Sequence, residues 1–116
     1  MPLRPLLLAL LLPLTGCGLF RPAAAPPPDA AVLVLINRAE IPVRYVYLSP
    51  CDAGEWGPDR MAPDEVVMPG QSRTFALEPG CWDARAVFRD GREAEERGVA
   101  MTRGSHRTWT VMEPEG

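Results

Sequence analysis

The residues best suited to chemistry lie in one nine-residue stretch, residues 51–59, with the sequence CDAGEWGPD. Besides a thiol, it offers carboxylates and an indole that could contact a ligand: Asp52, Glu55, Trp56 and Asp59. Carboxylate oxygens suit Ca²⁺, but the spacing does not match an EF-hand and Pro58 limits how the chain could wrap an ion. We assign no metal ligands, and two interpretations stay open. The stretch is either a solvated acidic loop or part of a binding loop for peptide, carbohydrate or Ca²⁺ that spans residues 51–69.

Trp56 itself has two interpretations. A tryptophan beside glycine often folds over the open end of a hydrophobic core, and Gly57 would supply the backbone freedom for the turn, with Met61 packing beneath the ring. Alternatively, the indole is exposed and binds a ligand. Asp59 is suited to cap a single helical turn over residues 60–62.

A catalytic centre is not expected. His106 is the only histidine, and it follows Ser105 directly. Adjacent residues of a strand point to opposite faces, so the two side chains do not form a nucleophile and base. Asp83 and Arg85 are two positions apart, so they share a face and could pair with each other. We therefore expect no catalytic residue, no enzymatic activity and no cofactor.

The amino terminus has the features of a secretion signal. Arg4 precedes a short leucine-rich run, residues 5–14, and small residues follow it. The run is too short to span a bilayer, which takes roughly 20 apolar residues, and Arg21 closes the window. We therefore expect residues 1–16 to be removed as a signal peptide.

The tetrad Leu14-Thr15-Gly16-Cys17 resembles the lipobox of bacterial lipoproteins. The resemblance covers about the first 18 residues. It implies that Cys17 becomes the first residue of the mature protein and carries acyl chains such as palmitate on its sulfur and its amino group. Three acyl chains exceed the two signals needed for stable membrane anchoring. Gly18 stands where an Asp would favour retention in the inner membrane, so the resemblance implies an outer-membrane lipoprotein that faces the periplasm.

Residues 17–30 are expected to form a lipid-anchored Pro/Ala-rich linker. Consecutive prolines favour an extended polyproline conformation that cannot join a core. Removal of residues 1–16 leaves 11 arginines against 15 carboxylates, a net charge of −4. Because this charge has the wrong sign for phosphate contacts, nucleic acid is excluded as a partner.

Residues 31–113 are predicted to form the folded domain. Short apolar or alternating segments separated by turn residues predict six to seven strands. The predicted strands are 31–36, 42–48, 71–77, 81–89, 92–97 and 106–112. Asp90-Gly91 is typical of a two-residue hairpin turn, and the polar segment 92–97 is either a charged edge strand or a short helical turn. No segment could form a crossover helix, so parallel pairing is not expected. The fold class is therefore a small antiparallel β-sandwich, immunoglobulin-like or transthyretin-like.

Two thiols remain once Cys17 is lipidated. A domain of this size in an oxidising compartment commonly needs a covalent staple, so we expect Cys51 and Cys81 to form a disulfide. Free thiols or metal ligation are the alternatives. By the chain-entropy model the bridge would contribute roughly 3.5 to 4 kcal/mol.

The domain also resembles a set of short secreted bacterial domains of unknown function. The shared pattern covers most of residues 32–99 and consists of Asn37, Ser49-Pro50, Trp56-Gly57-Pro58-Asp59, Pro69-Gly70, Asp83-Ala84-Arg85 and Asp90-Gly91. The resemblance implies a β-sandwich and a structural role for the loop, and it implies no activity.

From the sequence we expect a membrane-anchored lipoprotein that acts as a non-enzymatic structural or protein-interaction module in the cell envelope. Its partners would be the membrane, through Cys17, and an envelope protein. The alternative is an accessory ligand-binding lipoprotein that uses the loop 51–69. The sequence does not indicate an oligomeric state.

Overall fold

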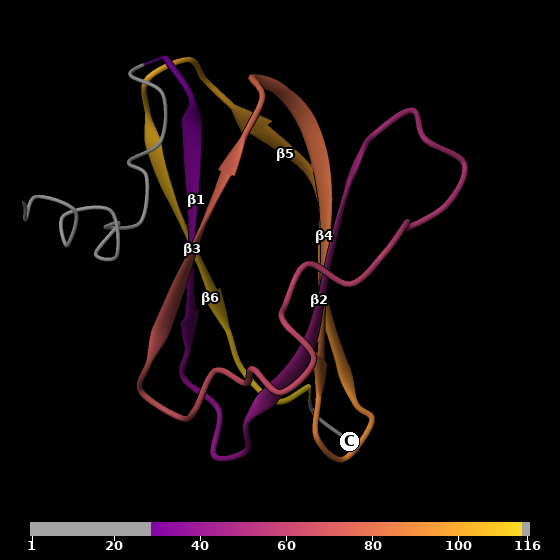
Figure 1. The fold of residues 1–116 in the computed structure, drawn as a ribbon, viewed down its shortest axis with the longest axis vertical. Coiled ribbons are helices and arrows are strands. Elements are labelled where there is room, and N and C mark those ends of the chain that lie inside the picture. The colour runs from indigo at the N-terminus through magenta and orange to yellow at the C-terminus, as the bar shows by residue number, and fades with distance from the viewer. Residues whose placement is uncertain (1–28, 115–116) are drawn as a thin grey trace, which may run out of the picture.

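The protein is an all-β domain of two three-stranded sheets packed face to face (Figure 1). The computed structural model describes residues 29–114, so the predictions for the signal peptide, Cys17 and most of the linker lie outside the described residues. Sheet A has the order β3-β1-β6 and sheet B the order β2-β4-β5. The strands are β1 (Ala31–Asn37), β2 (Val43–Pro50), β3 (Ser72–Leu77), β4 (Gly80–Phe88), β5 (Glu93–Met101) and β6 (His106–Val111). The predicted β-sandwich is confirmed, and the described residues hold no helix long and apolar enough to cross a membrane.

The core lies between the two sheets and is filled by alternate side chains of every strand. Leu33 and Leu35 point inward from β1, and Ala84, Ala86 and Phe88 point inward from β4. The run 31–36 is apolar throughout because β1 is the central strand of sheet A. The clean alternation predicted for β4 is also confirmed, since its outward positions are only partly buried.

One strand pair departs from the predicted antiparallel arrangement. β1 pairs with β3 in antiparallel fashion, but β1 and β6 are parallel, with Val32 opposite His106. A parallel pair needs a long crossover connection. Here the whole of sheet B, together with β3, supplies the connection, because β1 and β6 are the first and last strands of the domain. No crossover helix is therefore required, and the prediction of wholly antiparallel pairing is wrong at this pair.

The β4–β5 hairpin has a three-residue loop, Arg89 to Gly91, instead of the predicted two-residue turn. The Phe88 N–H donates to the Arg92 carbonyl at 2.8 Å, and the Gly91 N–H donates to the Phe88 carbonyl at 2.9 Å. Gly91 has a φ of 94°, which only glycine adopts at little cost. β5 is an edge strand of sheet B, as the charged sequence predicted, and it is not helical.

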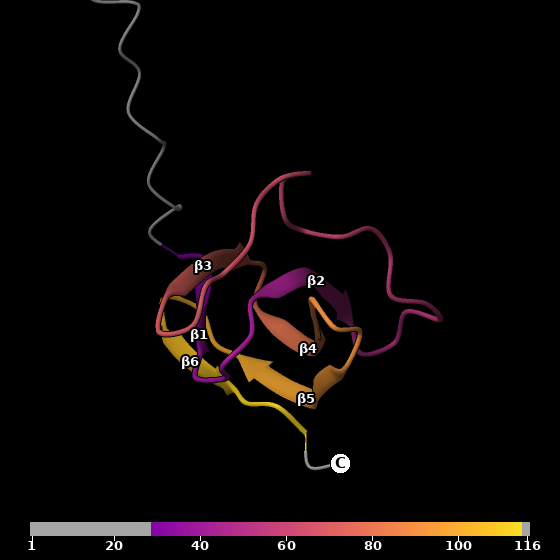
Figure 2. The same cartoon turned by 90° about the horizontal axis from the view of Figure 1, so that it is seen from below.

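The long connection between β2 and β3, residues 51–71, runs along the side of the sandwich between these two edge strands (Figure 2). Met61 and Val67 are buried in the core. Val67 forms an isolated bridge with Val43, and the described residues hold six strands. Residues 60–62 form no helical turn. The connection therefore closes this side of the core by inserting side chains of its second half.

Asn37 fixes the end of this connection. Its side chain is fully buried, and its Nδ2 donates to the carbonyls of Ile41 and Val67 at 3.0 and 2.9 Å. Its Oδ1 accepts from the Ala39 N–H at 2.9 Å, and its backbone carbonyl accepts from the Gly70 N–H at 2.7 Å. Because a buried amide is costly unless its hydrogen bonds are made, this asparagine specifies how β1 ends and where β3 can begin.

Candidate functional site

The outer face of sheet B carries aromatic and charged side chains, whereas its inner face is apolar. Strand alternation places these outward residues in three cross-strand rows. The face consists of Tyr45, Tyr47 and Ser49 from β2, Asp83, Arg85 and Val87 from β4, and Glu93, Glu95 and Arg97 from β5. The rings of Tyr45 and Tyr47 lie 6.4 Å apart between centroids.

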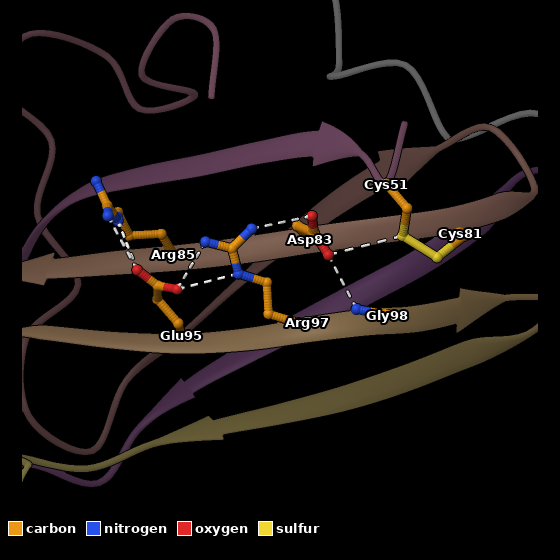
Figure 3. A network of polar contacts seen from close by, with 7 residues as sticks. All are labelled: Cys51, Cys81, Asp83, Arg85, Glu95, Arg97 and Gly98. Atoms are coloured by element: carbon orange, nitrogen blue, oxygen red, sulfur yellow. Dashed lines mark hydrogen bonds and ion pairs between the residues drawn. A yellow bond between two sulfur atoms is a disulfide. The ribbon is translucent and has the colours of Figure 1, made fainter. Parts of the chain in front are cut away.

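Ion pairs connect β4 and β5 across this face (Figure 3). Glu95 accepts from Arg85 Nη2 at 2.9 Å and lies 3.1 Å from Arg97 Nη2. The hydrogen bond from Arg85 is the main reason that the pKa of the Glu95 carboxyl lies below its usual range. The predicted pairing of Asp83 with Arg85 is wrong, although both residues do share a face. Each pairs with the neighbouring strand instead, because cross-strand neighbours lie closer than residues i and i+2 of one strand.

Asp83 lies at an irregularity in the β4–β5 ladder. Trp82 pairs with Val99 and Ala84 with Glu96, so β5 has one extra residue at this point. The Asp83 Oδ1 accepts from the Gly98 N–H at 2.9 Å, and Oδ2 lies 3.3 Å from Arg97 Nη1. One carboxylate therefore satisfies the bulged backbone, where Gly98 has a φ of 68°, and also positions Arg97.

Trp56 lies against this face. The guanidinium carbons of Arg85 and Arg97 are 4.9 and 4.8 Å from the centre of its ring. It is half-buried, and it is not among the partly buried side chains that pack on the core, Ile41, Trp82 and Ala94. The expectation that Trp56 covers the open end of the core is therefore wrong. Two arginines hold the indole by cation–π contacts, and Met61 enters the core independently.

The disulfide between Cys51 and Cys81 is present, as expected. Its two Cα atoms are 5.4 Å apart, and the Cys51 N–H donates to the Cys81 carbonyl at 3.0 Å. The bridge therefore joins residues that extend the β2–β4 ladder by one position, and it fixes the start of the long connection. The Cys51 sulfur also lies 3.6 Å from the Asp83 Oδ1. This contact is not a hydrogen bond, because the disulfide sulfur carries no proton.

A small pocket opens between the connection and the outer face of sheet B. Its volume is about 160 Å³, and it is lined by Ser49, Ala53, Gly54, Glu55, Trp56, Asp83 and Arg97. Only 7% of Ser49 is exposed, yet its hydroxyl makes no hydrogen bond to any residue in the range 29–114. Two of the four predicted binding residues, Glu55 and Trp56, contribute to this pocket.

The other two predicted binding residues lie elsewhere. Asp59 is committed to structure, because its Oδ1 accepts from the backbone N–H groups of Val46 and Met61 at 3.0 and 3.1 Å. Asp52 lines a separate pocket beside the disulfide, together with Glu78 and Trp82. Within the described residues, no three His, Cys, Asp or Glu side chains converge as metal ligands. The three carboxylates of the loop thus do not form the Ca²⁺ site considered from the sequence.

Ser105 and His106 offer no nucleophile and base in this conformation. The Ser105 hydroxyl donates to the Thr102 carbonyl at 2.7 Å within the turn that precedes β6. His106 begins β6 at an exposed position beside Val32.

Several residues of the site were not identified from the sequence. Strand pairing brings Ser49 next to Asp83 and Glu95 next to Arg85. The bulge in β5 brings Arg97 to the site. The alternation of residues 81–89 did indicate that Asp83 and Arg85 share a face. No sequence signal could have joined Trp56 to Arg97, because their contact depends on the path of the connection.

No protein-family model matches the chain, and no curated protein sequence matches it. Among solved structures, the fold is similar to an NMR structure of a protein from Eubacterium rectale, with a TM-score of 0.54. The two chains are 14% identical, and the similarity covers 75% of this chain and 81% of that one. At this identity the likeness concerns the fold alone.

Proposed function

We propose that the protein is a non-enzymatic interaction module of the cell envelope, held at the outer membrane by lipidated Cys17, and that the outer face of sheet B contacts an envelope protein. The tetrad 14–17 supports the anchor, and the linker that follows supports a domain held away from the bilayer. The proposal of a docking surface rests on the outer face of sheet B.

The residue types on this face carry the proposal. Tyrosine, tryptophan and arginine are the side chains most enriched at protein–protein hot spots. Here Tyr45 is 37% exposed and Arg97 is exposed. Glu95 holds Arg85 in position, and Asp83 holds Arg97. Such preorganisation lowers the entropy lost on binding. By contrast, the outer face of sheet A presents short uncharged side chains from each of its strands, such as Val34, Thr74 and Thr108.

The second candidate is an accessory ligand-binding lipoprotein that uses the loop 51–69. The pocket beneath residues 53–56 favours it, because Glu55 and Trp56 line that pocket. At about 160 Å³ the pocket is smaller than the roughly 300 to 1,000 Å³ typical of sites for whole small molecules. It is better matched to a single group that protrudes from a larger partner.

The docking proposal is tested by crosslinking the tagged full-length protein in its membrane and purifying the products. We expect one discrete product that Tyr45→Ser/Tyr47→Ser abolishes. The matched control, Thr74→Ala/Thr108→Ala on the outer face of sheet A, should retain it. Loss of the product with both variants, or with neither, would contradict the assignment of the surface.

The anchor is tested separately through Cys17→Ser. This variant should leave the membrane fraction and lose the acyl mass from the amino-terminal peptide. Retention of the variant in the membrane would contradict lipid anchoring through this residue.

A further inference from the structure

We propose that the pocket between residues 53–56 and the outer face of sheet B binds a primary ammonium group, such as the tip of a lysine side chain of the partner. The inference rests on the proposed docking function and names the group that this surface recognises. It follows from the acceptors that line the pocket, from their charge and from its size.

The acceptors match the donors of an ammonium group. A primary ammonium has three N–H donors and no acceptor. Three of the residues that line the pocket have acceptor side chains: Glu55 and Asp83 with carboxylates, and Ser49 with a hydroxyl. Ser49 is more than nine-tenths buried, and its hydroxyl has no partner among residues 29–114. Burying a hydroxyl without a hydrogen bond is unfavourable, and a bound donor would remove that cost.

The charges around the pocket favour a cation. Glu55 and Asp83 contribute two carboxylates and Arg97 contributes one guanidinium, while the guanidinium of Arg85 at Trp56 is already paired with Glu95. Arg97 holds Asp83 at 3.3 Å, and 61% of its side chain is exposed. Arg97 also pairs with Glu95 at 3.1 Å, so an incoming ammonium can replace it at Asp83 while Glu95 keeps Arg97 in position. Asp83 would still accept from the Gly98 N–H through its other oxygen.

The indole of Trp56 adds a surface that already attracts cations. Two guanidinium groups lie within 5 Å of its ring centre. An alkylammonium could contact the ring through its methylene groups and by a cation–π interaction. The volume of about 160 Å³ suits such a tip, whereas a folded segment would not fit.

The test uses the ¹⁵N-labelled full chain in detergent micelles and follows the indole N–H signals of its three tryptophans. The probes are Nα-acetyl-lysine methylamide, its Nε-acetylated neutral form, and alanine methylamide, whose ammonium is at the chain terminus. We expect a saturable shift of the Trp56 signal, assigned with Trp56→Phe, for an ammonium probe and none for the neutral form. Tighter binding of the lysine probe assigns the pocket to a side chain, and tighter binding of the alanine probe assigns it to an amino terminus.

Two carboxylate variants make the test specific. Glu55→Gln should weaken the binding of the ammonium probe about tenfold, because one charge-assisted hydrogen bond is lost. Asp52→Asn is the matched control, since it removes a carboxylate three positions away that lines the other pocket, and it should leave binding unchanged.

Either of two results would overturn the inference: no saturable shift with either ammonium probe, or equal binding of the neutral form. Its failure is distinguishable from failure of the proposed function. If the crosslinked product depends on Tyr45 and Tyr47 while no ammonium probe binds, only the inference fails. If a probe binds and no crosslinked product forms, only the proposed protein partner fails.

Discussion

The two halves of the connection between β2 and β3 both carry acidic residues but have opposite relations to the domain. In the first half, residues 51–57, the disulfide and the contact of Trp56 with two arginines hold the chain, and residues 54–57 make no hydrogen bond to other described residues. In the second half, residues 58–71, backbone and side-chain hydrogen bonds follow one another, and two side chains enter the core. Both halves contain acidic residues and glycine.

This difference shows that the density of carboxylates does not indicate which of them can bind a ligand. Asp59 and Glu65 belong to the second half and accept hydrogen bonds from the protein itself. Asp52 and Glu55 belong to the first half and accept none from the described residues. Carboxylates that already have protein donors are unavailable, so Asp52 and Glu55 retain a binding capacity that Asp59 and Glu65 lack.

The largest effect on this contrast is expected from Asn37→Ala, which removes the anchor of the second half. The carbonyls of Val67 and Ile41 and the N–H of Ala39 would all lose their partner. We expect unfolding to become easier by about 4 kcal/mol, measured by urea denaturation, because three backbone groups lose their partner at once. Arg38→Ala, an exposed neighbour, should change stability by less than about 0.5 kcal/mol. A loss for Asn37→Ala no larger than for this control would show that the second half is held elsewhere.

A slightly smaller effect is expected from Cys51→Ser/Cys81→Ser, which releases the covalent restraint on the first half. The bridge spans a separation of 30 residues. The chain-entropy model gives a loss of about 3.5 kcal/mol, to be measured by thermal unfolding. Hydrogen exchange of residues 58–67 should still show protection below the melting temperature. Loss of protection at residues 58–67 in this variant would mean that the two halves do not behave separately.

Asp59→Ala tests the second half at one carboxylate. Two backbone N–H groups, of Val46 and Met61, would lose their acceptor. We expect a loss of about 2 kcal/mol by chemical denaturation. Asp52→Ala in the first half should change stability by less than about 0.5 kcal/mol. Similar losses for the two variants would remove the distinction between the halves.

Trp56→Ala should have a modest effect on stability. Cation–π contacts at exposed sites contribute about 0.5 to 1 kcal/mol each, and two are lost. We therefore expect a loss of about 1 kcal/mol in thermal unfolding, with larger consequences for ammonium binding. A loss above about 3 kcal/mol, typical of a core tryptophan, would show that the ring covers the core after all.

The smallest expected effect is on the pH dependence of stability, through Glu65 in the second half. Hydrogen bonding to Arg73 lowers the pKa of Glu65 below its usual value. Because the folded pKa is the lower one, this contribution is fully present above the unfolded value of about 4.3 and is lost as the pH falls through the folded value. We expect at most about 1 kcal/mol, since both side chains are partly exposed. Glu65→Gln should reduce the loss of stability in acid, and an unchanged profile would contradict this role.

Most of the fold could be predicted from the sequence, because side-chain alternation records which positions are buried. The segments 31–36, 81–89 and 106–112 were located to within about two residues. Alternation does not record which strand lies alongside, so the parallel pair of β1 and β6 was missed. The Asp90-Gly91 turn was found but its length was not, since the positive φ of Gly91 occurs in both two- and three-residue loops.

Less of the candidate site could be predicted. The disulfide followed from the number of cysteines, and of the four predicted binding residues only Glu55 and Trp56 line the same pocket. The two arginines that contact Trp56 come from β4 and β5. The sequence around a tryptophan beside glycine does not distinguish a ring that covers the core from one that packs on two guanidinium groups. Asp59 accepts a hydrogen bond from the Val46 N–H of β2. The sequence of the loop alone does not indicate this contact, because β2 lies earlier in the chain.

The central position of β1 has a mechanical consequence. β1 lies between β3 and β6, and the chain enters it at Ala31, the end nearest the proposed anchor. A pull between the membrane and a partner held on sheet B would have a component along β1. It would load both flanking rows of hydrogen bonds together in shear, so they would have to break as a group. An edge strand in this place could be peeled away one bond at a time, and the domain would yield to a much weaker force.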